Sequence, residues 1–280
     1  YFWALDLWPE SIKAAGNVNS RLIYFFALKI TKFIYKHSDK ILVSSEGFIQ
    51  SIINKGVPKH KIIFFPQWAE SIFNPKITKK LKYKTTFPDG FIVMFAGNIG
   101  EAQDFESILK SADHLRSEKS IYWIIIGSGR KENWVKQEIK NRKLEHNVWL
   151  LGRFPIEEMP ELYAYSDALL VSLKKEKIFS LTIPAKIQSY LASAKPILTM
   201  LDGEGSKVVN DSKSGYVAKS GDAIILAENV RKMYLLNKNE LLKLGINGRK
   251  YYERHFDRDL LLNKFLNIVK SNYERNHWKY

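Results

Sequence analysis

The chain has 280 residues, more than one hydrophobic core usually serves, and 45% of them are hydrophobic, so we expect a globular protein of two domains. It has no cysteine, which excludes thiolate catalysis, disulfides and cysteine-bound zinc and fits a reducing compartment. Lysine and arginine outnumber aspartate and glutamate by 44 to 29, and the charge of +15 favours nucleic acid, anionic lipid or phosphorylated substrates as partners without choosing among them.

The chain begins on a predicted strand, Tyr1 to Leu5, without a methionine, so we expect that part of the first domain precedes it. No apolar run in the sequence approaches the ~20 residues that are needed to span a bilayer.

The segment from Val18 to Lys40 is apolar and aromatic, and lysines recur along one side of it. A helix of this kind can lie in a membrane interface. It can also pack against further strands of the first domain, because it is apolar around much of its circumference. The sequence leaves both interpretations open.

Short apolar runs alternate with helical segments along the chain, which predicts an α/β protein whose parallel sheet is covered by helices on both faces. The predicted buried strands are Ile41 to Ser44, Ile62 to Phe65, Phe91 to Ala96, Ile121 to Gly127, Val148 to Leu151, Ala168 to Ser172 and Pro196 to Met200.

The pattern stops between Pro66 and Gly90, where prolines and a lysine-rich stretch indicate a connection between domains. We therefore assign residues 1–85 to a first domain with its linker and residues 86–252 to a second domain. Residues 253–280 form the end of the chain, with an amphipathic helix from about Asp257 to Ile268.

Three of the predicted strands run into glycine turns. The turns are Gly97-Asn98-Ile99-Gly100, Gly127-Ser128-Gly129-Arg130 and Gly152-Arg153-Phe154. In a doubly wound sheet such turns open on the same edge, and a turn before a helix aims backbone N–H groups at an anion. They predict a diphosphate site, although tight connections without a ligand are the alternative for each turn alone.

A fourth element runs from Ser172 to Ile197. A strand leads into a basic loop that contains Lys174 and Lys175, and Pro184 then marks the first turn of a helix that carries Lys186.

These segments together resemble the family 4 glycosyltransferases, especially the branch of N-acetylfucosamine and colanic-acid type transferases. The resemblance also rests on Gly203-Glu204-Gly205 and, nearer the front, on Asp6 to Ser11, Val43 to Phe48 and Phe65 to Trp68. It implies a GT-B fold, with two Rossmann-like domains facing a cleft: residues 1–85 belong to an acceptor-side domain, incomplete here, and residues 86–252 to a donor domain that binds the nucleotide-sugar. In this family the C-terminal helix, within residues 253–280, returns to the acceptor domain.

The resemblance further implies a retaining transfer of sugar from a nucleotide-sugar, with UDP as the expected nucleotide, to a lipid-linked or oligosaccharide acceptor. No metal or other cofactor is expected. It places the protein in the cytoplasm, peripheral on the inner face of the plasma membrane, and the helix that contains Val18 to Lys40 would then contact anionic lipid. Because one wall of the cleft is incomplete, these 280 residues alone are not expected to turn over substrate.

The sequence departs from the family at its donor contacts. In most members the helix after the basic loop carries two glutamates separated by seven residues, which contact the donor sugar and the ribose. This chain has Leu181 and Ser189 at the corresponding positions. Asn98 and Gln103 stand near the places of the arginine and lysine that usually neutralise the diphosphate. We expect lysines to supply that charge, which requires no metal.

The candidate catalytic residues are Lys186 and Asp6, which lies near the position of a histidine in many relatives; as an equal alternative, Asp6 caps a helix before Pro9. The candidate nucleotide-sugar contacts are Gly97, Asn98, Gly100, Gln103, Gly127, Ser128, Gly129, Arg153, Phe154, Lys174, Pro184, Lys186, Gln188 and Ser189.

A nucleotide-sugar-binding protein without catalysis is the alternative function. Nucleic-acid binding is disfavoured because the basic residues are not gathered with aromatics on one module.

Overall fold

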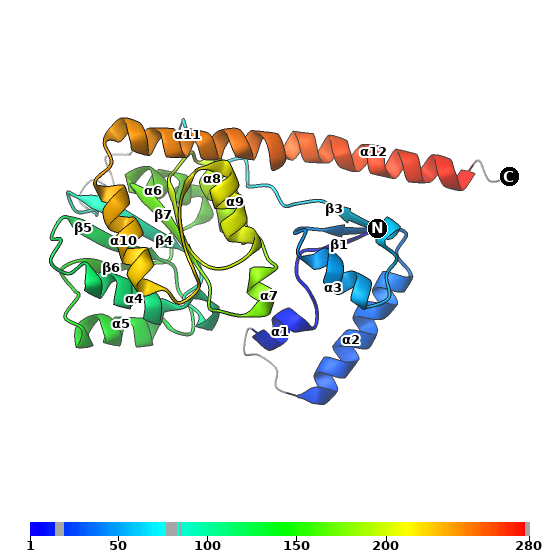
Figure 1. Ribbon diagram of the computed structural model, residues 1–280, viewed down its shortest axis with the longest axis horizontal. Helices are drawn as coiled ribbons and strands as arrows, with labels where there is room; N and C mark the ends of the chain where they lie inside the picture. The colour runs from blue at the N-terminus through cyan, green and yellow to red at the C-terminus, as the bar shows by residue number, and fades with distance from the viewer. Residues whose placement is uncertain (15–19, 77–82, 84–85, 278–280) are drawn as a thin grey trace.

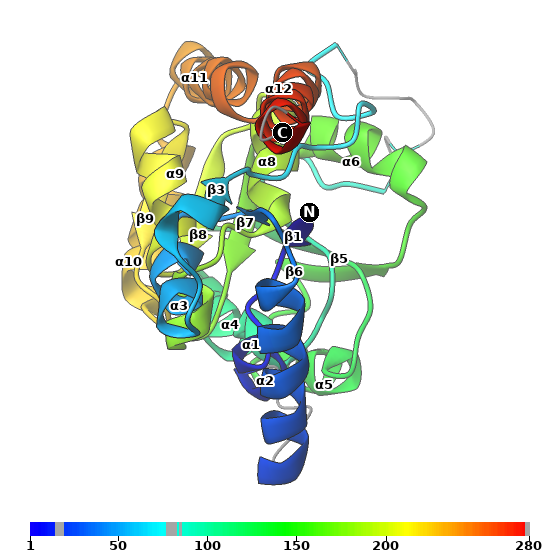
Figure 2. The ribbon, with the colours of Figure 1, turned by 90° about the vertical axis from the view of Figure 1, so that its right-hand side faces the viewer.

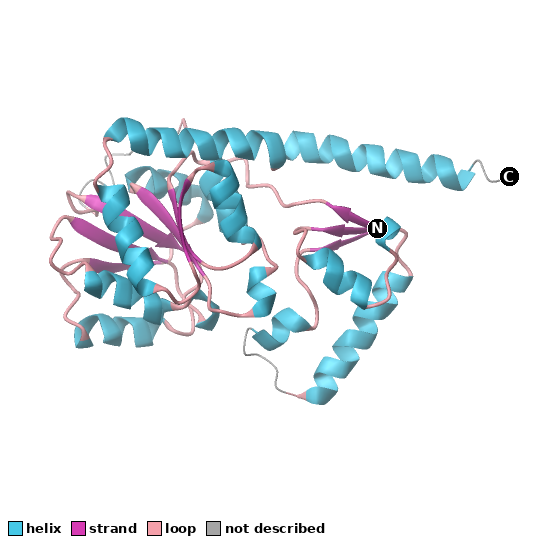
Figure 3. Ribbon diagram, in the orientation of Figure 1, coloured by secondary structure: helices cyan, strands magenta, loops and turns pink. Residues whose placement is uncertain are grey.

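A computed structural model describes residues 1–14, 20–76, 83 and 86–277 of the chain (Figure 1). Its strands form two separate parallel sheets, one of three and one of six strands, each covered by helices (Figure 3). This confirms the predicted α/β class. Among the described residues no helix combines the length and the apolar character that a membrane crossing requires.

The three-stranded sheet has the order β1-β2-β3, with β1 at Phe2–Ala4, β2 at Ile41–Val43 and β3 at Ile62–Phe64. Four helices accompany it: α1 (Glu10–Ala14), α2 (Arg21–Lys36), α3 (Phe48–Asn54) and the 3-10 helix η1 (Lys59–Lys61). Phe48 and Ile52 of α3 and Tyr35 of α2 are buried in one cluster with Ile41 and Val43. Burial of these side chains fixes the helices on the sheet.

The larger sheet has the order β6-β5-β4-β7-β8-β9, and all of its strand pairs are parallel. The strands are β4 (Phe91–Ala96), β5 (Ile121–Ile126), β6 (Val148–Gly152), β7 (Ala168–Ser172), β8 (Ile197–Met200) and β9 (Gly215–Ala218). The order reverses between β4 and β7, as in a doubly wound dinucleotide-binding fold, and ligands bind such sheets at this switch point.

Successive side chains of β4 point to opposite faces of the larger sheet, as in any strand. Phe91, Val93 and Phe95 pack with the helices of one face, whereas Ile92 and Met94 pack with those of the other. The first face carries α4 (Phe105–His114), α5 (Glu132–Asn141) and α10 (Ala223–Tyr234). The second face carries α6 (Met159–Tyr165), α8 (Ala185–Ala192), α9 (Glu204–Ser212) and α11 (Lys238–His255). Short elements at the loops are η3 (Glu101–Gln103), η4 (Ile156–Glu158) and α7 (Lys177–Ser180).

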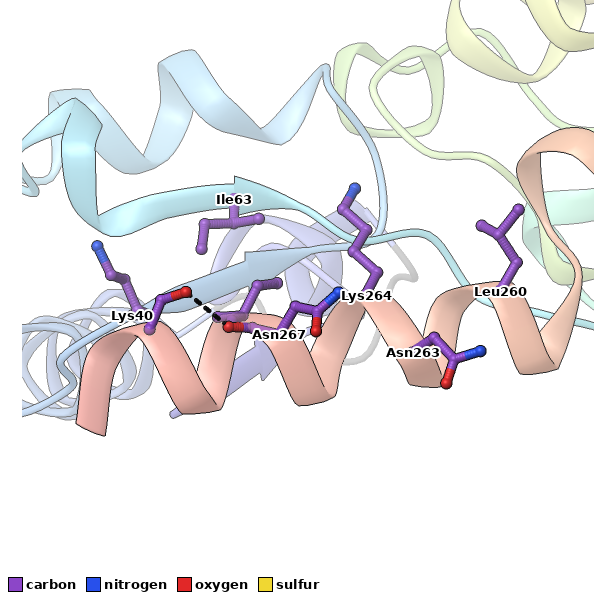
Figure 4. A pocket seen from close by; sticks show the side chains of 8 residues that line it. Lys40, Ile63, Leu260, Asn263, Lys264 and Asn267 are labelled. Atoms are coloured by element: carbon purple, nitrogen blue, oxygen red, sulfur yellow. Dashed lines mark hydrogen bonds between the residues drawn. The ribbon is translucent and has the colours of Figure 1, made fainter. Parts of the chain in front are cut away.

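The last helix, α12 (Arg258–His277), leaves the larger unit and runs along the three-stranded sheet (Figures 1 and 2). Leu261 is buried against Leu42 and Phe65. The Lys264 ammonium donates to the Phe64 carbonyl at 2.9 Å, and its aliphatic part lines an open groove of about 630 Å³ between α12 and β3 (Figure 4). Partial burial lowers the pKa of Lys264.

The strand predictions agree with the structure to within one residue at either end. The final helix extends to His277, well beyond the predicted end at Ile268. β9 was not predicted, because Gly215–Ala218 is only four residues long and begins on a glycine, so its strand signal is weak.

Candidate functional site

Two of the glycine turns predicted from the sequence, with Gly152 of the third, meet at the carboxyl ends of β4, β5 and β6. Backbone hydrogen bonds join them: the Gly97 N–H donates to the Ile126 carbonyl at 2.8 Å, and the Gly127 N–H donates to the Gly152 carbonyl at 2.7 Å. Gly127 has a φ of +141°, and a Cβ atom there would lie 1.8 Å from the Gly97 carbonyl oxygen. Only glycine permits this approach, so the turns form one rigid edge.

A cavity of about 620 Å³ opens beside this edge. Its floor is formed by the ends of β4 and β5, its sides by the loop after β6 and the start of α8, and its outer rim by the connection between the two sheets. The predicted contacts that line it are Gly97, Asn98, Gly127, Ser128, Arg153, Phe154, Lys186 and Ser189. The cavity thus lies where the strand order favours a ligand.

Lys186 occupies the first turn of α8, which begins after Pro184 without a capping side chain. Part of the side chain remains accessible, but the ammonium lies 3.9 Å from the centroid of the Phe95 ring and beside Gly97. Burial lowers the pKa of Lys186 to about 7. No carboxylate of the described residues forms an ion pair with it, so its charge is offset only by the ring face.

The other predicted contacts lie outside the cavity. The Gln103 side-chain oxygen accepts from the Gly100 N–H at 3.1 Å and so closes the first turn. Gln188 is 1% exposed. Its side-chain amide, oriented so that its hydrogen bonds are formed, donates to the carbonyls of Pro184 and Ala185. These residues, with Gly129, which packs on the Ile99 carbonyl, shape the turns from behind.

Lys174 also lies outside the cavity, because Glu101 holds it. The Glu101 carboxylate is 2.9 Å from the Lys174 ammonium and 2.7 Å from that of Lys131. Hydrogen bonds from Lys131 and Lys174 lower the pKa of Glu101. The three side chains join the loops that follow β4, β5 and β7, so this ion-pair cluster fixes the loops relative to one another.

Asp6 follows β1 and is solvent-exposed, and it does not line the cavity. Its carboxylate accepts no hydrogen bond from the described residues, so the alternative role as a helix cap is not seen. Desolvation by the surrounding atoms raises the pKa of Asp6.

The residue after Asp6, Leu7, lines a second cavity of about 570 Å³ between α1, α3 and α7. Glu10, Gln50 and Asn54 add polar groups to its wall. Glu10 forms an ion pair with Lys55 at 2.7 Å, and its other carboxylate oxygen is buried and accepts no hydrogen bond from the described residues.

The sequence did not single out several residues that line the first cavity. Gln67, Trp68 and Glu70 come from the connection between the sheets, and Tyr163 comes from α6. Trp68 packs on Trp3 of β1 with ring centroids 5.4 Å apart, so the rim is attached to the smaller sheet. The signal in the sequence was the resemblance of Phe65-Pro66-Gln67-Trp68 to the family, which assigned these residues no contact with the donor.

Comparison with known proteins identifies the family. Residues 77–251 match the family described as "Glycosyl transferases group 1". The chain is 25% identical over 280 residues to WbjE of Pseudomonas aeruginosa, named a probable glycosyltransferase, and covers 68% of that protein with 96% of its own length. It is 25% identical to WcaI of Escherichia coli, named for a glycosyl transferase of colanic acid biosynthesis, and spans 57% of that protein with 83% of its own length.

In fold the chain is similar to Anabaena HepE, whose crystal structure contains UDP. The TM-score is 0.76 at 14% identity, and the match covers 96% of this chain and 71% of HepE. This likeness confirms the predicted GT-B fold.

Proposed function

Since the chain belongs to the glycosyl transferases of group 1, we propose that it transfers a sugar from UDP-sugar to a lipid-linked or oligosaccharide acceptor, with retention at the anomeric carbon. One observation carries the donor half of this proposal. The Lys186 ammonium lies against the Phe95 ring, beside a glycine turn at the switch point of a doubly wound sheet, and no carboxylate of the described residues pairs with it. A diphosphate is the group that such a site is built to receive.

We choose UDP as the nucleotide because the crystal structure of HepE, which has a similar fold, contains UDP. The acceptor class is assigned on the resemblance to transferases of surface polysaccharides and on the name of WcaI. An acceptor carried by lipid would place the protein on the inner face of the plasma membrane, as a peripheral protein.

The reaction breaks the bond between the anomeric carbon and the diphosphate oxygen and forms a bond to an acceptor hydroxyl oxygen. A diphosphate oxygen accepts the proton of that hydroxyl. Lys186, which lies beside the Gly97 turn, stabilises the negative charge that develops on the leaving diphosphate. Retention follows when the acceptor attacks on the face that the diphosphate leaves.

The first experiment is calorimetric titration of the chain with UDP. Binding is expected, and its absence would overturn the donor assignment. Release of UDP from UDP-sugars is then measured with the complete gene product and a lipid extract. Binding without release, whatever the acceptor, would favour the second candidate, a nucleotide-sugar-binding protein without catalysis. Leu181 and Ser189 at the positions of the family glutamates give that candidate its support.

A further inference from the structure

The cavity at the switch point has one acidic side chain in its wall, and that side chain does not come from the larger sheet or its helices. All of the residues that line the cavity lie between Gln67 and Ser189, and Glu70 is the only carboxylate among those described. Glu70 belongs to the connection that leads from β3 to the larger unit. The other charged groups of the wall are the cations Arg153 and Lys186. The wall therefore combines cations for a diphosphate with a single strong hydrogen-bond acceptor.

Contacts on both sides of Glu70 hold it at the rim of the cavity. Ala69 and Phe73 are 4% and 6% exposed and belong to the hydrophobic core of the larger unit. The Phe73 ring stacks on the Tyr163 ring with the centroids 5.5 Å apart. The Phe73 N–H donates to the backbone carbonyl of Glu70 at 3.0 Å and closes a turn between them. The buried neighbours thus fix the backbone of Glu70, while its side chain remains exposed and lines the cavity.

The Glu70 carboxylate makes no ion pair within the part of the chain that the structure describes, although cations line the same cavity. Glu101, behind the glycine turns, is different, because its carboxylate pairs with both Lys131 and Lys174. A carboxylate that stays apart from the cations of its own site can accept hydrogen bonds from hydroxyl groups of a ligand.

We propose that Glu70 binds the ribose hydroxyls of the donor nucleotide and so selects a ribonucleotide over a deoxyribonucleotide. A diphosphate repels a carboxylate, so Glu70 does not face that part of the ligand. The base meets the apolar wall of Phe73, Phe154 and Tyr163. The ribose lies between base and diphosphate, and its adjacent 2′ and 3′ hydroxyls both donate to one carboxylate. This inference rests on the proposed function, because it takes UDP as the ligand.

The test compares the binding of UDP, 2′-deoxy-UDP and 3′-deoxy-UDP to the complete gene product by isothermal titration calorimetry. All three ligands carry the same base and diphosphate, so the ratio of their dissociation constants reports on the ribose hydroxyls. The unaltered protein should bind UDP roughly 10- to 100-fold more tightly than either analogue, since a hydrogen bond to a charged group contributes about this factor.

The preference for UDP should depend on Glu70. Glu70→Ala should bind the three ligands with dissociation constants within about twofold of one another, because the acceptor of both hydroxyls is gone. Glu70→Gln keeps one acceptor oxygen without the charge, and its preference should be intermediate. Glu157→Ala is the matched control. Glu157 is also exposed and follows Ile156 of the cavity wall, but it does not line the cavity itself, so this variant should keep the full preference.

The outcomes separate binding of the ribose from other roles of Glu70. Loss of a purely structural contact would lower the melting temperature and weaken all three ligands alike, and the unchanged ratio would overturn the proposal. Tighter binding of UDP by Glu70→Ala would also overturn it, because that result means that the carboxylate only repels the diphosphate. Equal affinity of the unaltered protein for UDP and both analogues would overturn this proposal alone. Absence of UDP binding would overturn the donor site as well.

Discussion

The low pKa of Lys186 makes UDP binding depend on pH in a direction that the structure fixes. Burial beside Phe95 lowers the pKa from 10.5 to about 7. The neutral amine therefore predominates above pH 7 when the site is empty. A bound diphosphate favours the ammonium, so it should raise the pKa again and bring a proton with it.

The expected size follows from this pKa. If only the protonated form binds well, the apparent dissociation constant of UDP rises about tenfold per pH unit once the pH is well above 7. Between pH 7, where half of the amine is already neutral, and pH 9 it rises roughly 50-fold. At pH 8 about 0.9 proton should be taken up per UDP bound. The phosphates of UDP are already ionised in this range, so they add little to the trend.

The assay is isothermal titration calorimetry of UDP binding in buffers of different ionisation enthalpy, which gives affinity and proton uptake together. Lys186→Met leaves an unbranched side chain that is one atom shorter and uncharged, and this variant should bind UDP weakly with little dependence on pH. Lys140→Met, on the exposed side of α5, should behave as the unaltered protein does. An affinity that stays flat from pH 7 to pH 9, with no buffer effect, would show that the ammonium does not meet the diphosphate.

Further outcomes follow from the same site. UDP affinity should be the same with and without EDTA, because no cluster of metal-ligating side chains occurs among the described residues; loss of binding on chelation would refute the metal-free site. Lys186→Ala should cost about 1.5–3 kcal/mol of UDP binding and Lys140→Ala far less, and equal affinities would remove Lys186 from the site. Gly127→Ala should lower both melting temperature and UDP affinity well beyond Gly152→Ala, since both have positive φ but only Gly127 faces a neighbouring carbonyl. Lys186→Met should raise the melting temperature at pH 6.5 more than at pH 9.5: the folded pKa lies below the unfolded one, so the cost of burying the charge is complete below about pH 7 and disappears toward pH 10.

Much of the larger unit could be predicted because its strands are buried on both faces. Phe91–Ala96 and Ile121–Ile126 are unbroken apolar runs that end in glycine turns, and that pattern is local in the sequence. Lys186 could be predicted as a site residue from a local pattern too, because Pro184 marks the start of its helix. Its burial could not be predicted, because the Phe95 ring that covers the ammonium comes from a strand far away in the sequence.

The positions of other side chains were not predicted correctly, because they depend on partners that lie far away in the sequence. Lys174 was expected at the diphosphate, but Glu101 lies within ion-pair distance of it. Conversely, Trp68 and Tyr163 reach the cavity from the connection between the sheets and from α6, and no spacing in the sequence relates these two segments. A pattern of residues indicates which turns can bind an anion, while the pairing of charged side chains decides which lysine is available for it.

The same reasoning accounts for Leu181, where the family carries a glutamate. Ile178, Phe179 and Leu181 pack into the hydrophobic cluster of the smaller unit, beside Phe48 and Val43. The loop after β7 is therefore an apolar contact between the two units, and it holds them together at the edge of the cleft. Exposing Ile178 and Leu181 by opening the cleft would cost on the order of 3 kcal/mol. A carboxylate at position 181 would have to be desolvated in that contact, which is costly. Because this loop joins the two units, we expect other residues to supply the polar contacts to the donor sugar. Ser189, at the position of the other family glutamate, does line the cavity and is a polar residue that could make such a contact.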